Sequence, residues 1–356
     1  MFKNVIFLTV FTLSFSLKTF SMGIETEVPK PMKFVAISNL LFDTIVKVPY
    51  EVLDSSIVPI IPHLAKGSTT WVNAGQSEVL SVEIRKYNKE YSGPGGSAAN
   101  TIAGLKKLGE EVGVIGALAN DNWAVSYKKS LKAKQIQYRT TYIRDHSLGS
   151  GNCTVLITNK DKSERTMLTN LGVSGSIVIS YENLSWILSA ECLIVEGYLF
   201  HPEETYQTIC LVAEEMKQNN KKVALTLSAD FCVRNNLDRI KKYMDSYVDI
   251  IIGNDTEMQI LTKKQSAPQA CEYLRSKGLV GAVTCGADGA YVFDHDEVHF
   301  IQSPQTVEIV DTTGAGDQFL AGFLYGLFNE KSLFESGQIG ATFAGKIIQS
   351  WGGQPD

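Results

Sequence analysis

Residues 311–317 read Asp-Thr-Thr-Gly-Ala-Gly-Asp and are the strongest candidate for chemistry in this chain. They follow a short β-branched run and precede a helical pattern at 318–328. Small residues let the backbone amides of Gly314, Ala315 and Gly316 point into one concavity, and a helix start adds partial positive charge. The sequence therefore predicts an anion site here that is suited to phosphate.

Asp317 lies in the first turn of the expected helix, beside this cradle. A carboxylate at that place can take the proton from an attacking hydroxyl while a phosphoryl group is transferred. The alternative is that Asp317 only caps the helix. The surrounding seven-residue pattern favours Asp317 as the general base.

Two other glycine-rich stretches are weaker signals. Residues 93–98 formally match the dinucleotide fingerprint, but that fingerprint needs a preceding strand, and residues 82–91 look charged and helix-like. Residues 340–347 nearly match a phosphate-binding P-loop, yet they lack its Ser or Thr and no strand precedes them. We expect neither to bind a nucleotide, and 340–347 to be a helix with small residues on a packing face.

From residue 32 onward, short β-branched runs alternate with amphipathic stretches. Strands are expected at 34–37, 112–115, 192–195, 222–226, 249–252, 280–284 and 307–310, and helices at 98–108, 124–133, 203–218 and 267–276. This alternation predicts an α/β fold with a mostly parallel sheet flanked by helices. Residues 45–73 and 139–170 read as β-rich without helices and are expected to form a small antiparallel lid. No linker divides the chain, so 32–356 is expected to be one domain that includes this lid.

Composition limits the function classes. Of 356 residues, 44% are hydrophobic and 20% charged, which is enough to bury a large core. Lys plus Arg is 33 against 38 Asp plus Glu, a net charge of −5 that argues against a general nucleic-acid binder. The six cysteines are scattered singly without a CxxC pair, so neither a zinc site nor a disulfide framework is indicated.

The first 31 residues differ from the rest. Lys3 precedes an uncharged run at 5–17, and the small residues Ser21 and Gly23 follow, which is the shape of a secretory signal peptide. The run is too short for a comfortable permanent span, and no other stretch is a membrane candidate. Alternatively, Met32 is the true start and 1–31 is an upstream extension; the sequence leaves both interpretations open.

Residues 311–324 (DTTGAGDQFLAGFL) resemble the C-terminal signature of the ribokinase-like (PfkB) family of sugar and nucleoside kinases. The chain also contains a Gly-Gly element at 95–101 and an Asn-x-x-Glu element at 254–257, so the likeness runs from residue 32 to the end. Stretches similar to bacterial adenosine-kinase-like members lie at 95–101, 163–167, 196–199 and 223–232. The resemblance implies a ribokinase-like fold and the site residues that follow.

For the substrate, the resemblance implies that Gly95 and Gly96 allow close approach of a sugar and that Asn100 bonds its hydroxyls. Two glycines could otherwise serve only as a helix-entry turn. Asp43, expected just after the first strand, resembles the family carboxylate that grips hydroxyls, with Asn39 nearby. A lone Asp after a strand is more often a turn residue.

For the nucleotide, the resemblance implies that Asn254 and Glu257 organise Mg²⁺ and its water around the phosphates of ATP. The alternative is an Asn helix cap with a Glu in the first turn. Thr284, Gly286 and Gly289 resemble the family's turn beside the ATP phosphates and would otherwise be a hairpin turn.

The resemblance further implies that Arg165, in the lid segment, clamps the transferring phosphate; an exposed Arg on a hairpin is the alternative. It also implies a monovalent cation, K⁺, near Asp311 and Thr313. Part of the lid, including Tyr142, would exclude water from the reaction.

The expected reaction is transfer of the γ-phosphate of ATP to a hydroxymethyl group, with Asp317 as the general base. Adenosine, which would be converted to AMP, is the first-choice substrate. Other purine nucleosides, ribose, fructose or a ketodeoxy sugar acid are the alternative substrates. A non-catalytic, exported nucleoside-binding protein is a further alternative, favoured only by the signal-like start. We expect a cytoplasmic enzyme with a small-molecule substrate and leave monomer and homodimer open.

Overall fold

Nine strands form the main sheet of the computed structural model, which describes residues 31–356 except 142, 144, 146, 159–164 and 306–307. In spatial order they are β14 (Val298–Gln302), β13 (Gly289–Phe293), β12 (Val280–Thr284), β11 (Ile250–Asn254), β10 (Lys222–Thr226), β9 (Cys192–Glu196), β1 (Phe34–Ile37), β5 (Val112–Gly116) and β6 (Gln137–Thr140). Strands β12 to β6 in this order are parallel, and β13 and β14 are antiparallel. The expected mostly parallel sheet is confirmed.

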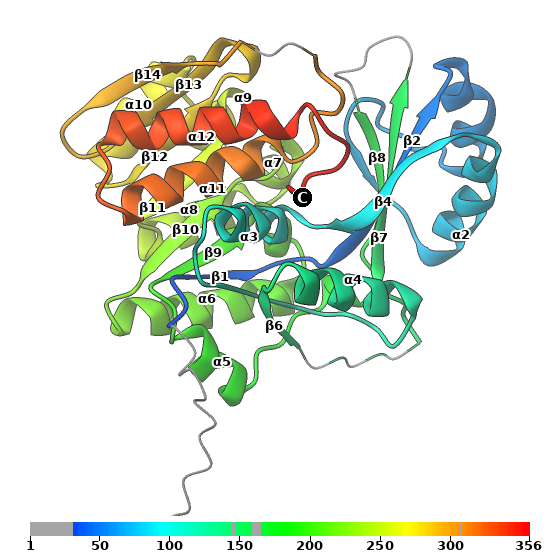
Figure 1. The fold of residues 1–356 in the computed structure, drawn as a ribbon, viewed down its shortest axis with the longest axis horizontal. Helices are drawn as coiled ribbons and strands as arrows, with labels where there is room; N and C mark the ends of the chain where they lie inside the picture. Colours follow the sequence, from blue (N-terminus) through cyan, green and yellow to red (C-terminus); the bar gives the residue numbers. More distant parts are fainter. Residues whose placement is uncertain (1–30, 142, 144, 146, 159–164, 306–307) are drawn as a thin grey trace, which may run out of the picture. The chain divides into compact units, whose positions relative to one another are not determined.

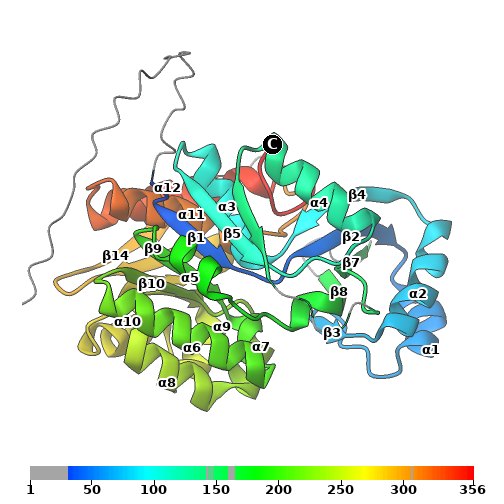
Figure 2. The same cartoon turned by 90° about the horizontal axis from the view of Figure 1, so that it is seen from below.

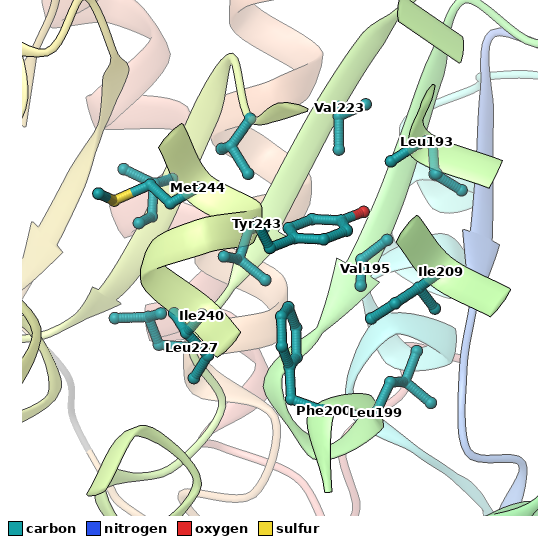
Figure 3. Close-up of a cluster of buried hydrophobic side chains, with 14 of the residues drawn as sticks. Leu193, Val195, Leu199, Phe200, Ile209, Val223, Leu227, Ile240, Tyr243 and Met244 are labelled. Carbon is teal, nitrogen blue, oxygen red and sulfur yellow. The ribbon is translucent and has the colours of Figure 1, made fainter. Parts of the chain in front are cut away.

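Helices cover both faces of this sheet (Figures 1 and 2). They are α3 (Ser97–Lys107), α4 (Asn122–Ala133), α5 (Tyr181–Ile187), α6 (Glu203–Gln218), α7 (Asp230–Asn235), α8 (Leu237–Tyr247), α9 (Asp255–Thr262), α10 (Ala267–Ser276), α11 (Ala315–Phe328) and α12 (Leu333–Ile347). On one face the core is built around Phe200 and Tyr243, whose ring centroids are 5.2 Å apart (Figure 3). On the other face α3, α11 and α12 bury Phe319 and Phe323. Apolar strands buried on both sides explain the runs seen in the sequence.

The P-loop-like stretch at 340–347 is part of α12, as expected. A Cβ atom at Gly322 of α11 would lie 2.8 Å from the backbone of Gly340, so the two helices meet through glycines. The small residues therefore allow close helix packing.

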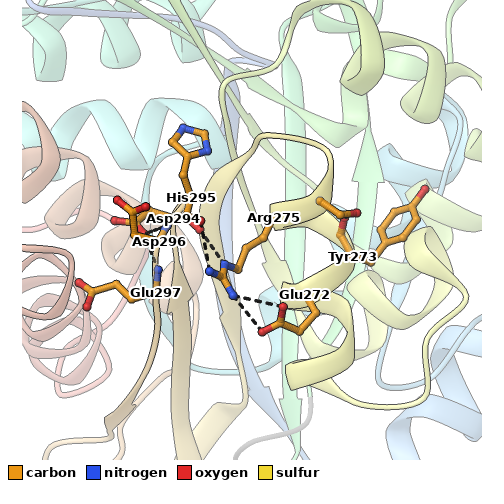
Figure 4. Close-up of polar contacts among 8 residues, drawn as sticks. Glu272, Tyr273, Arg275, Asp294, His295, Asp296 and Glu297 are labelled. Atoms are coloured by element: carbon orange, nitrogen blue, oxygen red, sulfur yellow. Dashed lines mark hydrogen bonds and ion pairs between the residues drawn. The ribbon is translucent and has the colours of Figure 1, made fainter.

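The outer hairpin of the main sheet is tied to α10 by one arginine (Figure 4). Arg275 donates to the carbonyl oxygens of Asp294 at 2.8 Å and His295 at 3.2 Å, and it forms an ion pair with Glu272 at 3.0 Å. These contacts fix the loop between β13 and β14.

A second, smaller sheet has the order β3 (Thr69–Trp71), β8 (Arg165–Asn170), β7 (Gly151–Thr158), β2 (Leu41–Val48) and β4 (Lys89–Gly95). Its outer face is covered by a helical segment at Leu53–Ile57, by α1 (Val58–Ile60) and by α2 (Ala74–Glu83). Together they enclose a separate apolar core that includes Leu53, Ile57, Leu80, Leu156 and Leu168.

The sequence located this sheet only in part. Residues 45–73 are not free of helices, and β2 begins earlier, at Leu41. The sheet is also mixed rather than antiparallel, because β2 and β7 pair in parallel, as do β3 and β8. Strand β6 ends the main sheet, so residues 139 and 140 do not belong to the second one.

Residues 82–91 look charged and helix-like, and residues 82–86 are indeed helical, as the end of α2 and a 3₁₀ turn at Ile84–Lys86. Strand β4, which begins at Lys89, was missed. It is an edge strand with several exposed or half-exposed side chains, a common place for charge in a sheet. The stated reason for rejecting the fingerprint at 93–98 was therefore wrong, although β4 pairs antiparallel with β2 and opens no parallel βαβ unit.

The expected strand at 307–310 is also wrong in its described part. Residues 308–310 form no strand, and the amides of Val310 and Asp311 donate to the carbonyl oxygen of Ile348 at 2.8 and 3.2 Å. The chain is thus pinned to the end of α12 instead of to a sheet.

Among the described residues, none of the helices has the length and apolar character needed to cross a bilayer. The leader proposed at 1–31 lies, apart from Pro31, outside the described residues, and so do Tyr142, Ser163, Glu164 and Val307.

Candidate functional site

The expected site residues gather where the carboxyl ends of parallel strands meet the starts of α3 and α11. Asn39 follows β1, Asn254 ends β11, and Thr284 ends β12 directly beside Asn254 in the strand register. Ligands of open α/β sheets bind at this edge.

Asp317 sits at this meeting point with both carboxylate oxygens occupied. Oδ1 accepts a hydrogen bond from Ser97 Oγ at 2.7 Å, and Oδ2 accepts one from Asn100 Nδ2 at 2.9 Å. Burial raises the pKa of Asp317 to about 6, while these two bonds and the charge of Arg165 pull it down. Asp317 is therefore held by α3 and would be ionised at neutral pH.

The loop before α11 uses only part of the amides at the helix start. The Ala315 amide donates to the carbonyl oxygen of Thr312 at 3.3 Å, whereas the amides of Gly314 and Gly316 have no acceptor among the described residues. Gly314 is the N-cap residue with φ 78°, and no side chain caps the helix there. A Cβ atom at Gly316 would meet nothing within 4 Å. Asp311 stabilises the loop conformation, because its Oδ1 accepts hydrogen bonds from the Thr313 amide at 2.9 Å and from Thr313 Oγ1 at 2.8 Å. Unpaired amides at an open helix start can bind an anion.

Arg165 reaches this loop from the first residue of β8. Its Nη1 donates to Thr313 Oγ1 at 3.2 Å. Burial lowers the pKa of the guanidinium, and the nearby charges of Asp311 and Asp317 raise it. Arg165 thus faces the loop and is not an exposed hairpin residue.

Asp43 follows the first strand, as expected, and lies within β2 instead of in a turn, with its carboxyl group against Gly95. A Cβ atom at Gly95 would lie 2.0 Å from Asp43 Oδ2. Asp43 is 7% exposed, and burial, helped by the charges of Asp317 and Asp311, raises its pKa to about 8. No donor among the described residues hydrogen-bonds to it, and with a pKa of about 8 the group is largely protonated at neutral pH, so it can both donate to and accept from substrate hydroxyls.

Both glycines of the Gly-Gly turn are required by their surroundings. Gly96 has φ 100°, and a Cβ atom there would lie 2.2 Å from the carbonyl oxygen of Asn39. Beyond the turn, Asn100 Oδ1 is buried and has no partner within the described part of the chain. An unpaired buried acceptor beside Asp317 and Asp43 can receive a substrate hydroxyl.

Asn254 and Glu257 form a capping box at the start of α9. Asn254 Nδ2 donates to Glu257 Oε1 at 2.8 Å, and the Asn254 amide donates to Oε2 at 2.9 Å. Burial raises the pKa of Glu257 to about 7, with Asp317 contributing. The structural alternative raised from the sequence is therefore present, and it orients this pair beside the site.

The stretch 284–289 is a tight connection between the antiparallel strands β12 and β13. Gly286 has φ 58° and Gly289 has φ 128°, conformations that favour glycine. Its hairpin geometry is the alternative raised above, and Thr284 lies next to Asn254.

The last residues of the chain contact the site, which no sequence pattern indicated. The Gly352 amide donates to Asp311 Oδ2 at 3.0 Å. Gln318 Nε2 donates to the carbonyl oxygens of Gly353 and Asn100, both at 2.9 Å. This segment lies against the glycine loop, since a Cβ atom at Gly314 would lie 2.5 Å from Gly353.

Three aromatic rings, also missed, join the two sheets beside the site. Trp71 of β3 lies 6.1 Å from Tyr198 and 5.8 Å from Phe231 of α7, and Tyr198 lies 6.0 Å from Phe231, between ring centroids. Tyr198 follows β9, and burial raises the pKa of its hydroxyl, with the charge of Asp317 contributing. Aromatic residues so far apart in sequence could be paired only by the fold.

Glu196, the last residue of β9, is a fully buried carboxylate that sequence reasoning assigned no role. Burial raises its pKa to about 7, and hydrogen bonds from Ala98, Asn39 and Ser38 lower it. Two sequence signals point to it: it is an acidic residue at the end of an apolar strand, and it begins the stretch 196–199 that resembles adenosine-kinase-like proteins.

The chain is similar to known kinases in sequence and in fold. The pfkB family carbohydrate kinase model matches residues 75–356. Adenosine kinase 2 of Arabidopsis thaliana is 27% identical over 75% of this chain and 81% of its own, and the ribokinase of Haemophilus influenzae is 26% identical over 73% and 82%. Among solved structures, adenosine kinase from Sinorhizobium meliloti has 26% identity and a TM-score of 0.80, covering 91% of this chain and 96% of its own. A probable sugar kinase from Rhizobium etli has 26% identity and a TM-score of 0.82, covering 91% and 95%.

Proposed function

This chain belongs to the pfkB family of carbohydrate kinases, and we propose that it phosphorylates the hydroxymethyl group of a nucleoside, adenosine first, with ATP as donor. The observation that carries the proposal is Asp317, held by Ser97 and Asn100 at the open start of α11. A fixed carboxylate beside free helix amides suits proton removal during phosphoryl transfer.

In the proposed mechanism the substrate hydroxyls bind Asp43 and Asn100, and the reacting hydroxyl gives its proton to Asp317. The amides at Gly314–Gly316 and the Arg165 guanidinium stabilise charge on the phosphoryl group. The second sheet closes over the substrate as a lid and excludes water. No covalent enzyme intermediate is needed.

A nucleoside is favoured over a simple sugar by the rings of Trp71, Tyr198 and Phe231. They are partly exposed and lie at the junction of the two sheets, near Asp317. A purine needs an aromatic or apolar wall, whereas a sugar needs mainly hydroxyl partners. The adenosine kinase relatives support the same choice.

A sugar substrate is the second candidate, because the hydroxyl-binding residues would serve either. Ribokinase and 5-dehydro-2-deoxygluconokinase are also among the relatives at similar identity. A non-catalytic, exported nucleoside-binding protein is disfavoured, since such a protein would not need the Asp317 arrangement.

The described residues fit Mg²⁺ held mainly by water and phosphate. They contain no cluster of three or more His, Cys, Asp or Glu side chains, and Mg²⁺ with ATP needs only one or two protein groups. Glu257 and Asn254 would hold it through water, and the ion would neutralise phosphate charge. The fully buried Asp311 also suits a K⁺ ion near Thr313.

We further propose a monomer in the cytoplasm, where ATP is available. The outer face of the second sheet, which would pair with its twin in a dimer, is covered by α1 and α2. Sedimentation analysis tests the oligomeric state.

The reaction itself is tested by ATP-dependent phosphorylation of a nucleoside and sugar panel.

A further inference from the structure

Glu196 uses both carboxylate oxygens to join three parts of the fold. Oε2 accepts from Ser38 Oγ at 2.7 Å and from the Ala98 amide at 2.8 Å, and Oε1 accepts from the Asn39 amide at 3.0 Å. The side chain is completely buried. Burying a carboxylate costs free energy unless hydrogen bonds to its oxygens offset the loss of water.

These bonds cap a helix that cannot cap itself. The N-cap residue of α3 is Gly96, which has no side chain to accept from the first amides. Glu196 accepts from Ala98, and Ser38 Oγ accepts from the Ala99 amide at 3.2 Å. Two of the orphan amides of α3 are thus satisfied from strands β9 and β1.

The same first turn of α3 holds Asp317. Ser97 and Asn100 donate to its carboxylate, and Thr101 Oγ1 donates to its carbonyl oxygen at 3.2 Å. A shift of this turn would move both donors relative to Asp317. Small displacements of this kind cost catalysis steeply.

We propose that Glu196 is a positioning residue for the phosphoryl transfer, an inference that rests on the proposed function. Its carboxylate caps α3 across the sheet and thereby fixes Ser97 and Asn100 against Asp317, while its bond to the Asn39 amide fixes the substrate side. Ser38 acts together with Glu196, because its hydroxyl donates to Glu196 and accepts from the Ala99 amide, which has no other acceptor in the described part of the chain. Glu196 acts through α3 and not on the nucleotide.

The test compares Glu196→Gln, Ser38→Ala and the double variant with Glu191→Gln, an exposed glutamate directly before β9, at the opposite end of the strand from Glu196. Glu196→Gln should lower kcat about 10- to 100-fold and raise KM for the nucleoside, with KM for ATP unchanged within about twofold. Ser38→Ala should lower kcat less, and the double variant should fall no further than Glu196→Gln. Glu191→Gln should match the wild type.

Hydrogen exchange supplies a readout that needs no activity. The amides of Ala98 and Ala99 should exchange faster in Glu196→Gln, while those of α8 should not change. If Glu196→Gln fails to fold, Ser38→Ala carries the same two measurements. An unchanged kcat, or a loss of kcat with both KM values and the α3 exchange unchanged, would overturn the inference. A wild type without kinase activity but with this exchange pattern would refute the proposed function and leave the capping intact.

Discussion

Asn100 Nδ2 donates a 2.9 Å hydrogen bond to Asp317 Oδ2 across 217 residues of sequence. The bond joins the Gly-Gly element to the glycine loop, two motifs that looked independent in the sequence. It gives the carboxylate of Asp317 a fixed direction and leaves Asn100 Oδ1 buried, with no partner in the part of the chain that the structure describes. The proposed reaction depends on this junction.

The rate should depend on the ionisation of Asp317. Its pKa is raised to about 6, and only the ionised form can accept a proton. We expect kcat for the nucleoside to fall as the pH drops below about 6. Just above neutral pH, where Asp317 is already ionised, its titration should cause no further change in kcat. A pH profile of kcat measures this, and an acid limb centred near the ordinary Asp value of 3.8 would contradict it.

Arg165→Gln should both slow the reaction and move that profile. The guanidinium lowers the pKa of Asp317 and lies at Thr313 of the phosphate loop. Removing it should lower kcat by at least about tenfold, as for loss of a charge-assisted contact, and shift the acid limb to higher pH. Arg234→Gln, a surface arginine paired with Asp230, is the control. If the acid limb of the pH profile and kcat are both unchanged in Arg165→Gln, Arg165 has no part in the mechanism.

Asp43→Asn should abolish binding of substrate hydroxyls yet stabilise the fold at higher pH. The folded pKa of Asp43 is about 8, above its ordinary 3.8, so the folded state holds the proton more tightly. Its contribution to stability is complete below pH about 4 and is lost as the pH rises to about 8. Asn does not titrate, so the variant's Tm should rise relative to the wild type between these limits.

Thermal unfolding from pH 4 to 8 measures this difference, with the exposed Asp238→Asn as the matched control. Each kcal/mol should move Tm by about 2 °C. A difference in Tm that stays constant with pH would show that Asp43 has an ordinary pKa in the fold.

Trp71→Ala should weaken the nucleoside specifically. Loss of one stacking ring costs about 1–3 kcal/mol per base, so KM for adenosine should rise about 5- to 150-fold with KM for ATP unchanged. Any turnover of free ribose should not change, because ribose has no base. Trp123→Ala, a partly exposed ring on α4 far from this trio in the chain, controls for loss of an aromatic side chain. Equal losses for adenosine and ribose would place Trp71 in the fold alone.

The sequence predicted six of the nine strands of the main sheet, β1, β5, β9, β10, β11 and β12, because they read as short apolar runs. It missed β6, β13 and β14, which lie at the two ends of that sheet. It also located Asp317 and the glycine loop, because the backbone conformation of this loop requires glycine and small residues at fixed positions, which form a recognisable motif. It missed β4, whose edge position admits charged residues, and it misplaced a strand at 307–310, where β-branched residues bond to the end of α12 instead.

The remaining site residues depend on contacts between distant segments. Gly352 and Trp71 carry no local pattern that separates them from ordinary core or loop residues. Glu196 and Phe231 lie in stretches that resemble adenosine-kinase-like proteins, but those stretches do not show what either side chain does. Their roles follow from burial and from partners that only the folded chain brings together. Asn254 and Glu257 show the reverse: the motif was clear, and the contacts it makes are those of a helix cap.

The central claim is most directly tested by ATP-dependent phosphorylation of adenosine, inosine, guanosine, ribose, fructose and ketodeoxygluconate, with Mg²⁺ and K⁺, comparing the wild type with Asp317→Asn. The account predicts adenosine as the best substrate and a loss of about 10²- to 10⁴-fold in kcat in the variant, with ATP binding retained. Preference for a sugar would overturn the nucleoside assignment. Equal turnover by Asp317→Asn, or no turnover of any compound by folded wild type, would contradict the proposed reaction.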